Sequence, residues 1–594
     1  MKLTKKNKPK VKRHRLFVVY FALTLIYIAL FGKITYIILF NGKQYKSLAD
    51  NQWFKTVSLP AKRGDIFDSS GRVLAVSSDV YRVDADIKTL NGSLSRNKIG
   101  LSDFNDEFSR ILDVKKGAML KLLTKRNSKN ELVSFTGIKR KVDKDTIDKI
   151  KALVKDNGVL GIIISQDSER YYPNNSFLSS VLGSTNQQGN GISGVELTYN
   201  NILSGKDGVE VIESDRHKNN LPYTSNQEVP AINGKNITLT IDNRIQYIVE
   251  TVAKETLRKT GAKNVNIIVA NPKNGEILAM TSKPDYNLND PSGNGKTISQ
   301  LQNIWKTKSV SDVFEPGSIF KAITAAAALE SNLDTSKLRF VCNGTIKVGG
   351  EVLHCDDNKA HGIETFSDII KNSCNVGFVE LSKKLGKNQI FSFAKNAGFG
   401  KKTGIDLPGE SSGIIKDQDS ARQIDTATMS YGQGIAVTQV QYIAAFNAIA
   451  NGGTWITPHV MKNIGHYNNN EKNVIDKSYD NYDRKTIMSP ENTKKLRKYL
   501  RRVVKEGTAK ATIIKGIPVA GKTGTARKVD AKTGGYKNHT YISSFAGMAP
   551  YNDPKITLIV SVDEPNPKTY YASQTAVPAA KKLFIQISKY INLK

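Results

Sequence analysis

The chain has 594 residues, of which 39% are hydrophobic, and its formal net charge is +33 at pH 7. At about 100–200 residues per domain, this length predicts three or four structural units. A mean hydropathy of −0.36 excludes a membrane protein with many spanning helices. Lysines and arginines are spread along the chain without a zinc-finger or RNA-binding motif, so we do not expect nucleic-acid binding.

The N-terminus combines a basic tail with a long apolar segment. Residues 1–15 carry eight lysines and arginines and no acidic residue, and the only charge in residues 16–40 is Lys33. About 20 apolar residues cross a bilayer, so we predict a transmembrane anchor whose basic flank stays in the cytoplasm. A cleaved signal peptide is the alternative, but the segment is too long and no small-residue cleavage site follows. The positive charge then suits anionic lipid and a cell-wall polymer.

Residues 41–233 are predicted to form an elongated mixed domain outside the cytoplasm. Residues 41–58 suggest a helical continuation of the anchor, and short apolar strands then alternate with polar helical stretches. Residues 225–236 are typical of a linker. This part of the sequence contains no catalytic constellation.

Residues 234–594 are predicted to form a second domain. They begin with a strand, a long helix that Gly261 ends, and a hairpin whose turn contains Asn274-Gly275, a pair that favours a tight turn. This order predicts an antiparallel sheet flanked by helices, which makes the fold class α/β of the mixed (α+β) kind.

Ser318 and Lys321 stand at the head of an alanine-rich helix, in the stretch FEPGSIFKAITAAAALE. Residues i and i+3 of a helix share a face, so we expect the amine to reach the serine oxygen. Unpaired N–H groups at a helix start favour a developing oxyanion. A lysine with a pKa near ~10.4 must be desolvated or placed near other cations to act as a base. The same spacing at Ser95–Lys98 and Ser392–Lys395 leaves an ordinary first helical turn as the alternative.

The sequence contains three cysteines, Cys342, Cys355 and Cys374. Cys342 and Cys355 could form a disulfide across a short polar excursion or remain reduced, and the sequence leaves both open. Their spacing with His354 and His361 could suggest a metal, but no second ligand pair follows, so we expect no metal site.

Two further motifs follow in order. Ser373-Cys374-Asn375 lies between two helical segments, where its hydroxyl could join a proton relay and its amide could hold a substrate amide; a helix N-cap is the alternative. Lys522-Thr523-Gly524-Thr525 follows the apolar run GIPVAG, which predicts a strand that carries Lys522 at a pocket edge. Gly524 would let a substrate approach the backbone. Other Lys-Thr-Gly triplets fall at a helix end, in a loop and in a hairpin turn.

These motifs resemble the S-x-x-K, S-x-N and K-T-G trio of penicillin-binding proteins and class A β-lactamases. RGDIFDSSGRVLA resembles the N-terminal signature of class B penicillin-binding proteins, with Asp68-Ser69 where Asp-Arg is usual. SERYYPNNSFLSSVLG and GISGVELTYNNILSGKDG resemble their second and third N-terminal motifs. DVFEPGSIFK, MSYGQGIAVTQVQ and VAGKTGTARK look most like the division-specific, septal member. The resemblance runs from the anchor to about Ala579.

The resemblance implies a serine D,D-transpeptidase that cross-links peptidoglycan stem peptides at the division septum. It implies that Ser318 attacks the penultimate D-alanine carbonyl and that Lys321 takes its proton. Ser373 would help to pass the proton to the departing D-alanine, and Asn375 would hold the substrate amide. The enzyme would need no cofactor, and β-lactam antibiotics would trap Ser318.

The resemblance also implies how the substrate is held. Lys522 and the hydroxyls of Thr523 and Thr525 would bind the terminal carboxylate, and the backbone N–H groups of Ser318 and Thr525 would form the oxyanion hole. An amine from a neighbouring stem peptide would then resolve the acyl-enzyme and form the cross-link.

The N-terminal motifs imply a structural role. Arg63, Asp65, Arg170 and Glu196 are expected to form buried polar links within the domain of residues 41–233, a dimerisation-type pedestal. Gly64 and Asp68 belong to the same motifs.

The resemblance further implies a setting. We expect a single-pass protein of the cell inner membrane with a cytoplasmic N-terminus and a periplasmic catalytic domain. Expected partners are a lipid-linked glycan polymerase and other division proteins.

Three alternatives remain at this point. A β-lactamase or antibiotic sensor would need a base that activates water, and no E-x-x-L-N segment lies between Ser373 and Lys522. A non-catalytic scaffold would recruit division proteins without using the trio. An elongation-type class B enzyme would share the chemistry and differ in where it acts.

Overall fold

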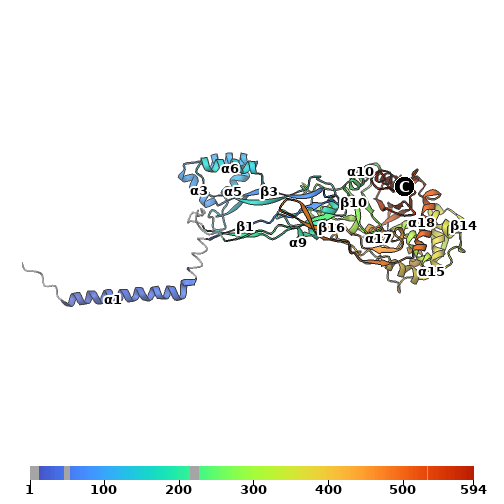
Figure 1. Ribbon diagram of the computed structural model, residues 1–594, viewed down its shortest axis with the longest axis horizontal. Coiled ribbons are helices and arrows are strands. Elements are labelled where there is room, and N and C mark those ends of the chain that lie inside the picture. The colour runs from blue at the N-terminus through green and yellow to red at the C-terminus, as the bar shows by residue number, and fades with distance from the viewer. Residues whose placement is uncertain (1–12, 44, 46–53, 214–226, 294, 531–532) are drawn as a thin grey trace, which may run out of the picture. The chain divides into compact units, whose positions relative to one another are not determined.

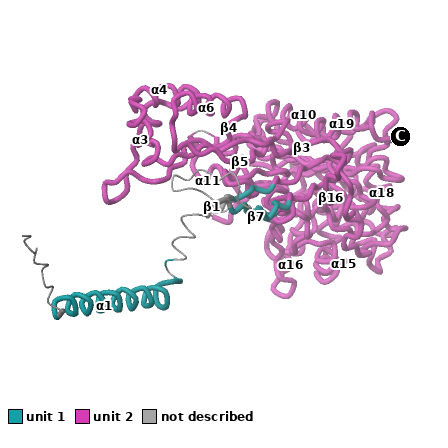
Figure 2. The backbone as a smooth tube through the Cα atoms, turned by 60° about the vertical axis from the view of Figure 1, so that its left-hand side comes forward, with its two compact units in different colours: residues 1–61, 206–232 teal, residues 62–205, 233–594 magenta. Residues whose placement is uncertain are grey.

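The computed structural model describes residues 13–43, 45, 54–213, 227–293, 295–530 and 533–594 (Figure 1). The chain forms two compact units, coloured separately in Figure 2. One contains residues 1–61 and 206–232, and the other contains residues 62–205 and 233–594. We describe each unit by itself.

The first unit holds the apolar helix and a small sheet. Helix α1 (Arg13–Tyr36) continues into the π-helical turn η1 (Ile37–Asn41). The span His14–Asn41 has a mean hydropathy of 2.1 and no buried part. A helix this long and apolar suggests a single-pass membrane anchor.

Strands β1 (Phe54–Leu59), β6 (Gly208–Glu213) and β7 (Gln227–Val229) form the sheet of this unit, in the order β1-β6-β7. The predicted helix over residues 41–58 is therefore wrong from Phe54 onward, because this segment pairs antiparallel with β6. Residues 46–53, in the middle of that prediction, lie outside the described residues. The predicted linker also contains β7.

The second unit is built on two sheets. The larger has the order β17-β16-β8-β2-β3-β4, with β5 also paired to β3. Its strands are β2 (Ile66–Phe67), β3 (Val73–Ala85), β4 (Thr136–Val142), β5 (Ile162–Tyr171), β8 (Asn236–Leu239), β16 (Met461–Tyr467) and β17 (Asn473–Ser478). The boundary predicted between residues 233 and 234 thus precedes a strand, β8, that lies beside the pedestal strand β2.

Four helices beside the end of β3 have a separate apolar core (Figure 1). They are α3 (Ile87–Arg96), α4 (Leu101–Ile111), α5 (Lys116–Leu123) and α6 (Lys144–Asp156). Aspartate side chains cap the N-termini of α3 and α6: Asp86 accepts a hydrogen bond from the Thr89 N–H, and Asp143 accepts one from the Thr146 N–H. These caps satisfy N–H groups that a helix start leaves unpaired.

The second sheet is antiparallel throughout, in the order β10-β9-β21-β20-β19. Its strands are β9 (Asn264–Ala270), β10 (Ile277–Lys283), β19 (Ala520–Val529), β20 (Tyr536–Ala549) and β21 (Ile556–Asp563). Helices α10 (Asn243–Thr260) and α19 (Ala576–Ile587) pack on each other and on this sheet, and α17 (Gln439–Ala450) packs on β9, β20 and β21. The predicted antiparallel sheet flanked by helices is confirmed.

The start of this domain follows the sequence closely. Helix α10 ends at Gly261, whose φ of 58° is in the left-handed region that glycine tolerates. Strands β9 and β10 form the predicted hairpin, and Gly275 takes a φ of 85° in its turn. The strand that precedes α10 is β8, however, which belongs to the other sheet.

The remaining elements of this unit are shorter or lie outside the two large sheets. They are α7 (Ser179–Leu182), α8 (Gly194–Thr198), α9 (Asn200–Leu203), α11 (Ile298–Trp305), α12 (Lys308–Ser311), η2 (Gly317–Phe320), α13 (Lys321–Leu329), β11 (Arg339–Cys342), β12 (Thr345–Val348), β13 (Glu351–His354), η3 (Asp356–Asn358), β14 (Gly362–Thr365), α14 (Phe366–Lys371), α15 (Asn375–Asn396), α16 (Gln423–Met429), β15 (Thr454–Ile456), β18 (Arg484–Thr486), α18 (Pro490–Lys505) and η4 (Lys510–Thr512).

A buried ion network joins the pedestal motifs. Glu196 is fully buried; Nε of Arg63 donates to its Oε2 at 2.7 Å, and Nε of Arg170 donates to its Oε1 at 2.6 Å. Burial alone would raise the pKa of Glu196, but the two guanidinium groups hold it below its usual value. Arg170 also donates to the Gly64 carbonyl at 2.9 Å. The network therefore ties the first motif to the second and third.

Three residues of the first motif shape the same region. A Cβ on Gly64 would lie 2.0 Å from the Lys235 carbonyl oxygen, so only glycine fits there. Asp68 accepts from the N–H groups of Ser70 and Arg72 at 2.8 and 2.9 Å and thereby closes a turn. Asp65 accepts from the Tyr467 hydroxyl at 2.7 Å, which links β16 to the pedestal.

Candidate active site

Ser318 lies in η2, a 3₁₀ helix of one turn that leads directly into α13. Gly317 takes a φ of 56°, and its N–H donates to the Gly432 carbonyl at 2.9 Å. A Cβ on Gly432 would lie 2.1 Å from the Gly317 oxygen, and a Cβ on Gly524 would lie 3.0 Å from the Pro316 oxygen. The absence of side chains at Gly432 and Gly524 thus lets η2 pack between the loop around Gly432 and strand β19. This packing holds Ser318, which is half-buried, beside the strand that carries the Lys-Thr-Gly motif.

Lys321 is fully buried and points to the Ser-x-Asn loop. Its Nζ lies 2.6 Å from the Ser373 carbonyl oxygen, 2.6 Å from Oδ1 of Asn375 and 3.2 Å from Oγ of Ser373. Among the described residues, the three hydrogen bonds of this amine go to that loop, whereas the helical spacing predicted contact with the Ser318 oxygen. Lys321 points to that loop because its buried amine finds hydrogen-bond acceptors there, the Ser373 carbonyl and the Asn375 amide oxygen.

Ser373 joins the two motif lysines. Its Oγ lies 2.8 Å from Nζ of Lys522, which extends from β19 and is also fully buried. Ser373 takes a φ of 58° between α14 and α15. This left-handed conformation of a non-glycine residue costs of order 1–3 kcal/mol, and such residues cluster at functional sites.

The two lysines have unusual electrostatics. Burial lowers the pKa of Lys321 to about 8. Burial, and then the like charge of Lys321, lower the pKa of Lys522 well below its ordinary value. Two ammonium groups on one hydroxyl repel each other, so one of the two amines is readily neutral near neutral pH. A neutral amine is what a general base requires.

The hydrogen-bond partners of Lys321 favour a base. The Ser373 carbonyl and the Asn375 amide oxygen can only accept hydrogen bonds, so a neutral Lys321 uses both of its hydrogens on them. Its lone pair is then left for a hydroxyl proton. Lys522 can donate to Ser373 while Ser373 donates to Lys321, which orders a chain for proton transfer.

The other motif residues make hydrogen bonds to the segments around the site. The amide nitrogen of Asn375 donates to the His354 carbonyl at 2.8 Å, which fixes the amide orientation. Cys374 caps α15, since its sulfur accepts from the Gly377 N–H. On β19, Thr523 Oγ1 lies 2.8 Å from Thr508 Oγ1, and Thr525 Oγ1 accepts from a backbone N–H, that of residue 572, at 3.1 Å.

One link near Ser318 was missed by sequence reasoning. Glu315 accepts from the Gly434 N–H at 2.7 Å and from the Tyr536 hydroxyl at 3.0 Å. Burial raises the pKa of this carboxyl. Glu315 lies three residues before Ser318, and only its position beside the Pro-Gly entry could have marked it.

Two family models match this chain. The Penicillin binding protein transpeptidase domain matches residues 265–584, and the Penicillin-binding Protein dimerisation domain matches residues 58–239. The chain belongs to the class B penicillin-binding proteins.

Relatives and solved structures agree with this membership. The chain is 33% identical over 573 residues to Stage V sporulation protein D of Bacillus subtilis, covering 96% of this chain and 84% of that protein. It is 27% identical over 582 residues to the Probable peptidoglycan D,D-transpeptidase PenA of Neisseria gonorrhoeae, covering 97% and 93%. Penicillin Binding Protein 2X from Streptococcus thermophilus is similar in structure, with a TM-score of 0.70 and 27% identity over 89% of this chain and 80% of that one. This class B penicillin-binding protein is a serine-type peptidoglycan D,D-transpeptidase.

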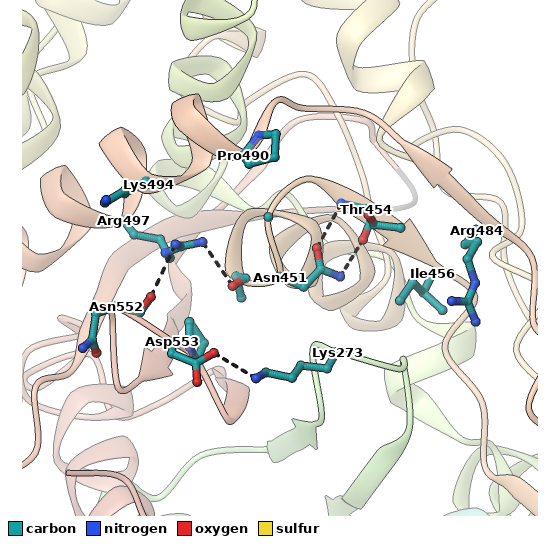
Figure 3. Close-up of a pocket in the computed structure, with 13 residues that line it drawn as sticks. Lys273, Asn451, Thr454, Ile456, Arg484, Pro490, Lys494, Arg497, Asn552 and Asp553 are labelled. Atoms are coloured by element: carbon teal, nitrogen blue, oxygen red, sulfur yellow. Dashed lines mark hydrogen bonds and ion pairs between the residues drawn. The ribbon is translucent and has the colours of Figure 1, made fainter.

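A cavity of about 590 Å³ in this penicillin-binding protein contains none of the motif residues (Figure 3). Basic side chains line it, among them Lys273, Lys494 and Arg497. Lys273 pairs with Asp553 at 2.9 Å, and Arg497 donates to carbonyl groups at the end of α17. The lining residues include no serine or cysteine, so the cavity lacks a nucleophile of the motif type.

The three cysteines are buried free thiols. The sulfurs of Cys342 and Cys355 lie 3.6 Å apart, well beyond the ~2.05 Å of a disulfide, so the disulfide considered from the sequence is not formed. Cys374 lies 3.7 Å from Cys355 and was not considered as their neighbour because it lies within the Ser-x-Asn motif. Of the two histidines considered, His361 contacts these thiols, with its Nδ1 3.4 Å from Sγ of Cys342. His354 is exposed, and its Nδ1 lies 2.8 Å from Oδ1 of Asn358 in η3.

Proposed function

We propose that this penicillin-binding protein cross-links peptidoglycan stem peptides through an acyl-enzyme on Ser318. The observation that carries the proposal is the convergence of two buried amines, Lys321 and Lys522, on the hydroxyl of Ser373 beside the turn that holds Ser318. Such an arrangement supplies a neutral base, a proton relay and a positive charge within one small region.

The acylation step follows from these groups. Lys321 takes the proton of Ser318 as Oγ forms a bond to the penultimate D-alanine carbonyl carbon. The N–H groups of Ser318 and Thr525 stabilise the oxyanion. The intermediate then collapses, the C–N bond to the terminal D-alanine breaks, and its nitrogen receives the proton from Lys321 through Ser373.

The second step releases the cross-linked product. The amine of a neighbouring stem peptide attacks the ester carbonyl and gives a proton to Lys321. The C–O bond to Ser318 breaks, and the proton returns to Oγ. Asn375 holds the substrate amide during both steps, and Gly524 leaves room for the substrate backbone.

Substrate binding would itself activate the base. The terminal carboxylate, held by Lys522, Thr523 and Thr525, favours the charged form of Lys522 because an opposite charge lies close to it. The charge on Lys522 then disfavours a second ammonium at Lys321. The arriving carboxylate thereby prepares Lys321 to accept the Ser318 proton.

A β-lactam would follow the first step and stop there. Its amide carbonyl and carboxylate correspond to those of D-alanyl-D-alanine, and its opened ring stays attached to Ser318. Fluorescent penicillin should label the wild-type chain and not Ser318→Ala. Ser392→Ala is the matched control, because Ser392 begins another Ser-x-x-Lys but is exposed on α15. Labelling that persists in Ser318→Ala would refute the proposal.

We further propose that the enzyme acts at the division septum, with a basic tail at residues 1–15, an anchor at residues 16–40, a pedestal at residues 41–233 and a transpeptidase domain at residues 234–594. The N-terminus would be cytoplasmic and the catalytic domain periplasmic. Its partners would be a lipid-linked glycan polymerase and other division proteins.

A second cellular role has one observation in its favour, the 33% identity to a protein named for stage V of sporulation. Depletion during growth separates the roles. Filaments would support septation, round cells would indicate elongation, and normal growth with defective spores would indicate sporulation.

A further inference from the structure

Four potential metal ligands converge beside the proposed active site. They are the thiols of Cys342, Cys355 and Cys374 and the ring of His361, and all four ligand atoms lie within 4.8 Å of one another. They come from separate segments: the end of β11, the residue before η3, the residue before β14 and the N-cap of α15. Cys342 and His361 lie next to each other where β11 pairs with β14, and Cys355 and Cys374 bring their sulfurs to the same point from two further segments.

The distances fit a tetrahedral ion. Zn–S bonds of about 2.3 Å and Zn–N bonds of about 2.0–2.1 Å at tetrahedral angles separate two sulfurs by about 3.8 Å and a sulfur from a nitrogen by about 3.6 Å. Sγ of Cys355 lies 3.6 Å from Sγ of Cys342 and 3.7 Å from Sγ of Cys374. Sγ of Cys342 lies 3.4 Å from Nδ1 of His361.

The surroundings supply the second shell that such a site needs. Backbone N–H groups of Val376 and Gly377 donate to the sulfurs of Cys355 and Cys374 at 3.5 and 3.2 Å. Such donors stabilise thiolates, the form in which cysteine binds metal.

A buried carboxylate next to the thiols points to a positive charge. Glu364 is only 2% exposed, and its Oε1 accepts from Asn372 at 2.8 Å. Its Oε2 lies 4.0 Å from Nδ1 of His361 and has no hydrogen-bond partner in the part of the chain that the structure describes. A buried carboxylate oxygen is costly without a partner, and a dication among the four ligands would offset that cost.

We propose that Cys342, Cys355, His361 and Cys374 bind one Zn²⁺ ion. Three thiols and one imidazole in tetrahedral array are a donor set that Zn²⁺ prefers. Four protein ligands close the coordination sphere, so the ion is structural and does not activate water. Binding releases the thiol protons to solvent, and no electron is transferred.

The ion would fix the Ser-x-Asn loop. Cys374 stands between Ser373 and Asn375, so a bond from its sulfur to zinc anchors the residues that contact Lys321. The same bond would hold Ser373 in its left-handed conformation. This role in positioning rests on the proposed function, whereas the metal site does not.

Metal analysis of the detergent-solubilised full-length chain tests the site. Plasma mass spectrometry should find about one zinc per chain in wild type and well under half of that in Cys342→Ser, a ligand outside the catalytic motifs. His354→Ala is the matched control, because His354 lies next to Cys355 but points away, and it should keep its zinc. If Cys342→Ser does not fold, X-ray absorption of the wild type decides, with an expected shell of three sulfurs and one nitrogen.

The alternative results are distinct. Wild type without metal, a Cys342–Cys355 disulfide found by thiol counting, or iron or copper in place of zinc would each overturn the proposal. The positioning role predicts that 1,10-phenanthroline slows acylation by penicillin at least several-fold and that Zn²⁺ restores the rate whereas Mg²⁺ does not. A chain with zinc that no penicillin acylates would refute the proposed function and leave the metal site standing.

Discussion

Nζ of Lys522 and Oγ of Ser373 lie 2.8 Å apart, although 149 residues separate them in the chain. This contact joins the strand β19 to the loop between α14 and α15, and Nζ of Lys321 lies 3.2 Å from the same oxygen. The site thus depends on one hydroxyl that two buried amines share, and its function should be sensitive to that hydroxyl.

Ser373→Ala should slow acylation by about 10²–10⁴-fold, the usual contribution of a positioned proton-transfer group. The second-order rate constant with fluorescent penicillin measures the effect. Ser382→Ala is a suitable control, since Ser382 is a buried serine of α15 whose hydroxyl donates to the Val379 carbonyl of the same helix. Equal rates for Ser373→Ala and wild type would exclude Ser373 from the relay.

The pH dependence of acylation should reveal Lys321. Burial lowers the pKa of Lys321 to about 8, and the base must be neutral to accept a proton. The rate should therefore rise about tenfold per pH unit below pH 8 and level off above it. The unfolding temperature is measured at each pH, so that loss of structure is not taken for titration. An acylation rate that decreases as the pH is raised from 6 to 8 would assign the base to another group.

Gly432→Ala should damage the site by moving η2. The added Cβ would lie 2.1 Å from the Gly317 oxygen, and φ at this position is 86°. We expect at least a tenfold loss in acylation rate, because small displacements of reacting groups are costly. Gly434→Ala is the control: its φ is 73°, but its nearest contact is a threonine side chain at 3.4 Å. Equal effects would mean that backbone strain, and not the position of η2, limits the rate.

The sequence predicted the parts of the site that depend on local pattern. The apolar run before Lys522 indicated a strand, and the helical segments on both sides of Ser373 indicated a loop between helices; the structure has both. Gly261 and Asn274-Gly275 likewise fixed a helix end and a turn, because left-handed backbone favours these residues.

Other features could not be read from the sequence because they depend on long-range packing. Cys374 meets Cys342 and Cys355 only once α15 lies beside β11 and β13. Strand β8 has the pattern of any short apolar strand, and its pairing with β2 depends on the close approach that Gly64 allows. The direction of Lys321 depends on hydrogen-bond acceptors at Ser373 and Asn375, which lie 52 and 54 residues away in the chain.

Glu196→Gln should destabilise the pedestal by about 3–5 kcal/mol, because it leaves two buried guanidinium groups without a counter-charge. Glu169→Gln is the control: Glu169 lies on the same strand as Arg170, pairs with Lys141 at 3.5 Å and is about 40% exposed, so its loss should cost under about 1 kcal/mol. Thermal unfolding at pH 7 measures both changes.

The pH dependence of the same variant supplies a second test of the network. The pKa of Glu196 is lowered in the folded chain, so its contribution is fully present above the unfolded pKa, near 4.5, and is lost as pH falls through the folded value. The difference between wild type and Glu196→Gln should therefore shrink as the pH is lowered below that point. A difference that stays constant down to the acid limit of folding would mean that the carboxylate charge does not stabilise the pedestal.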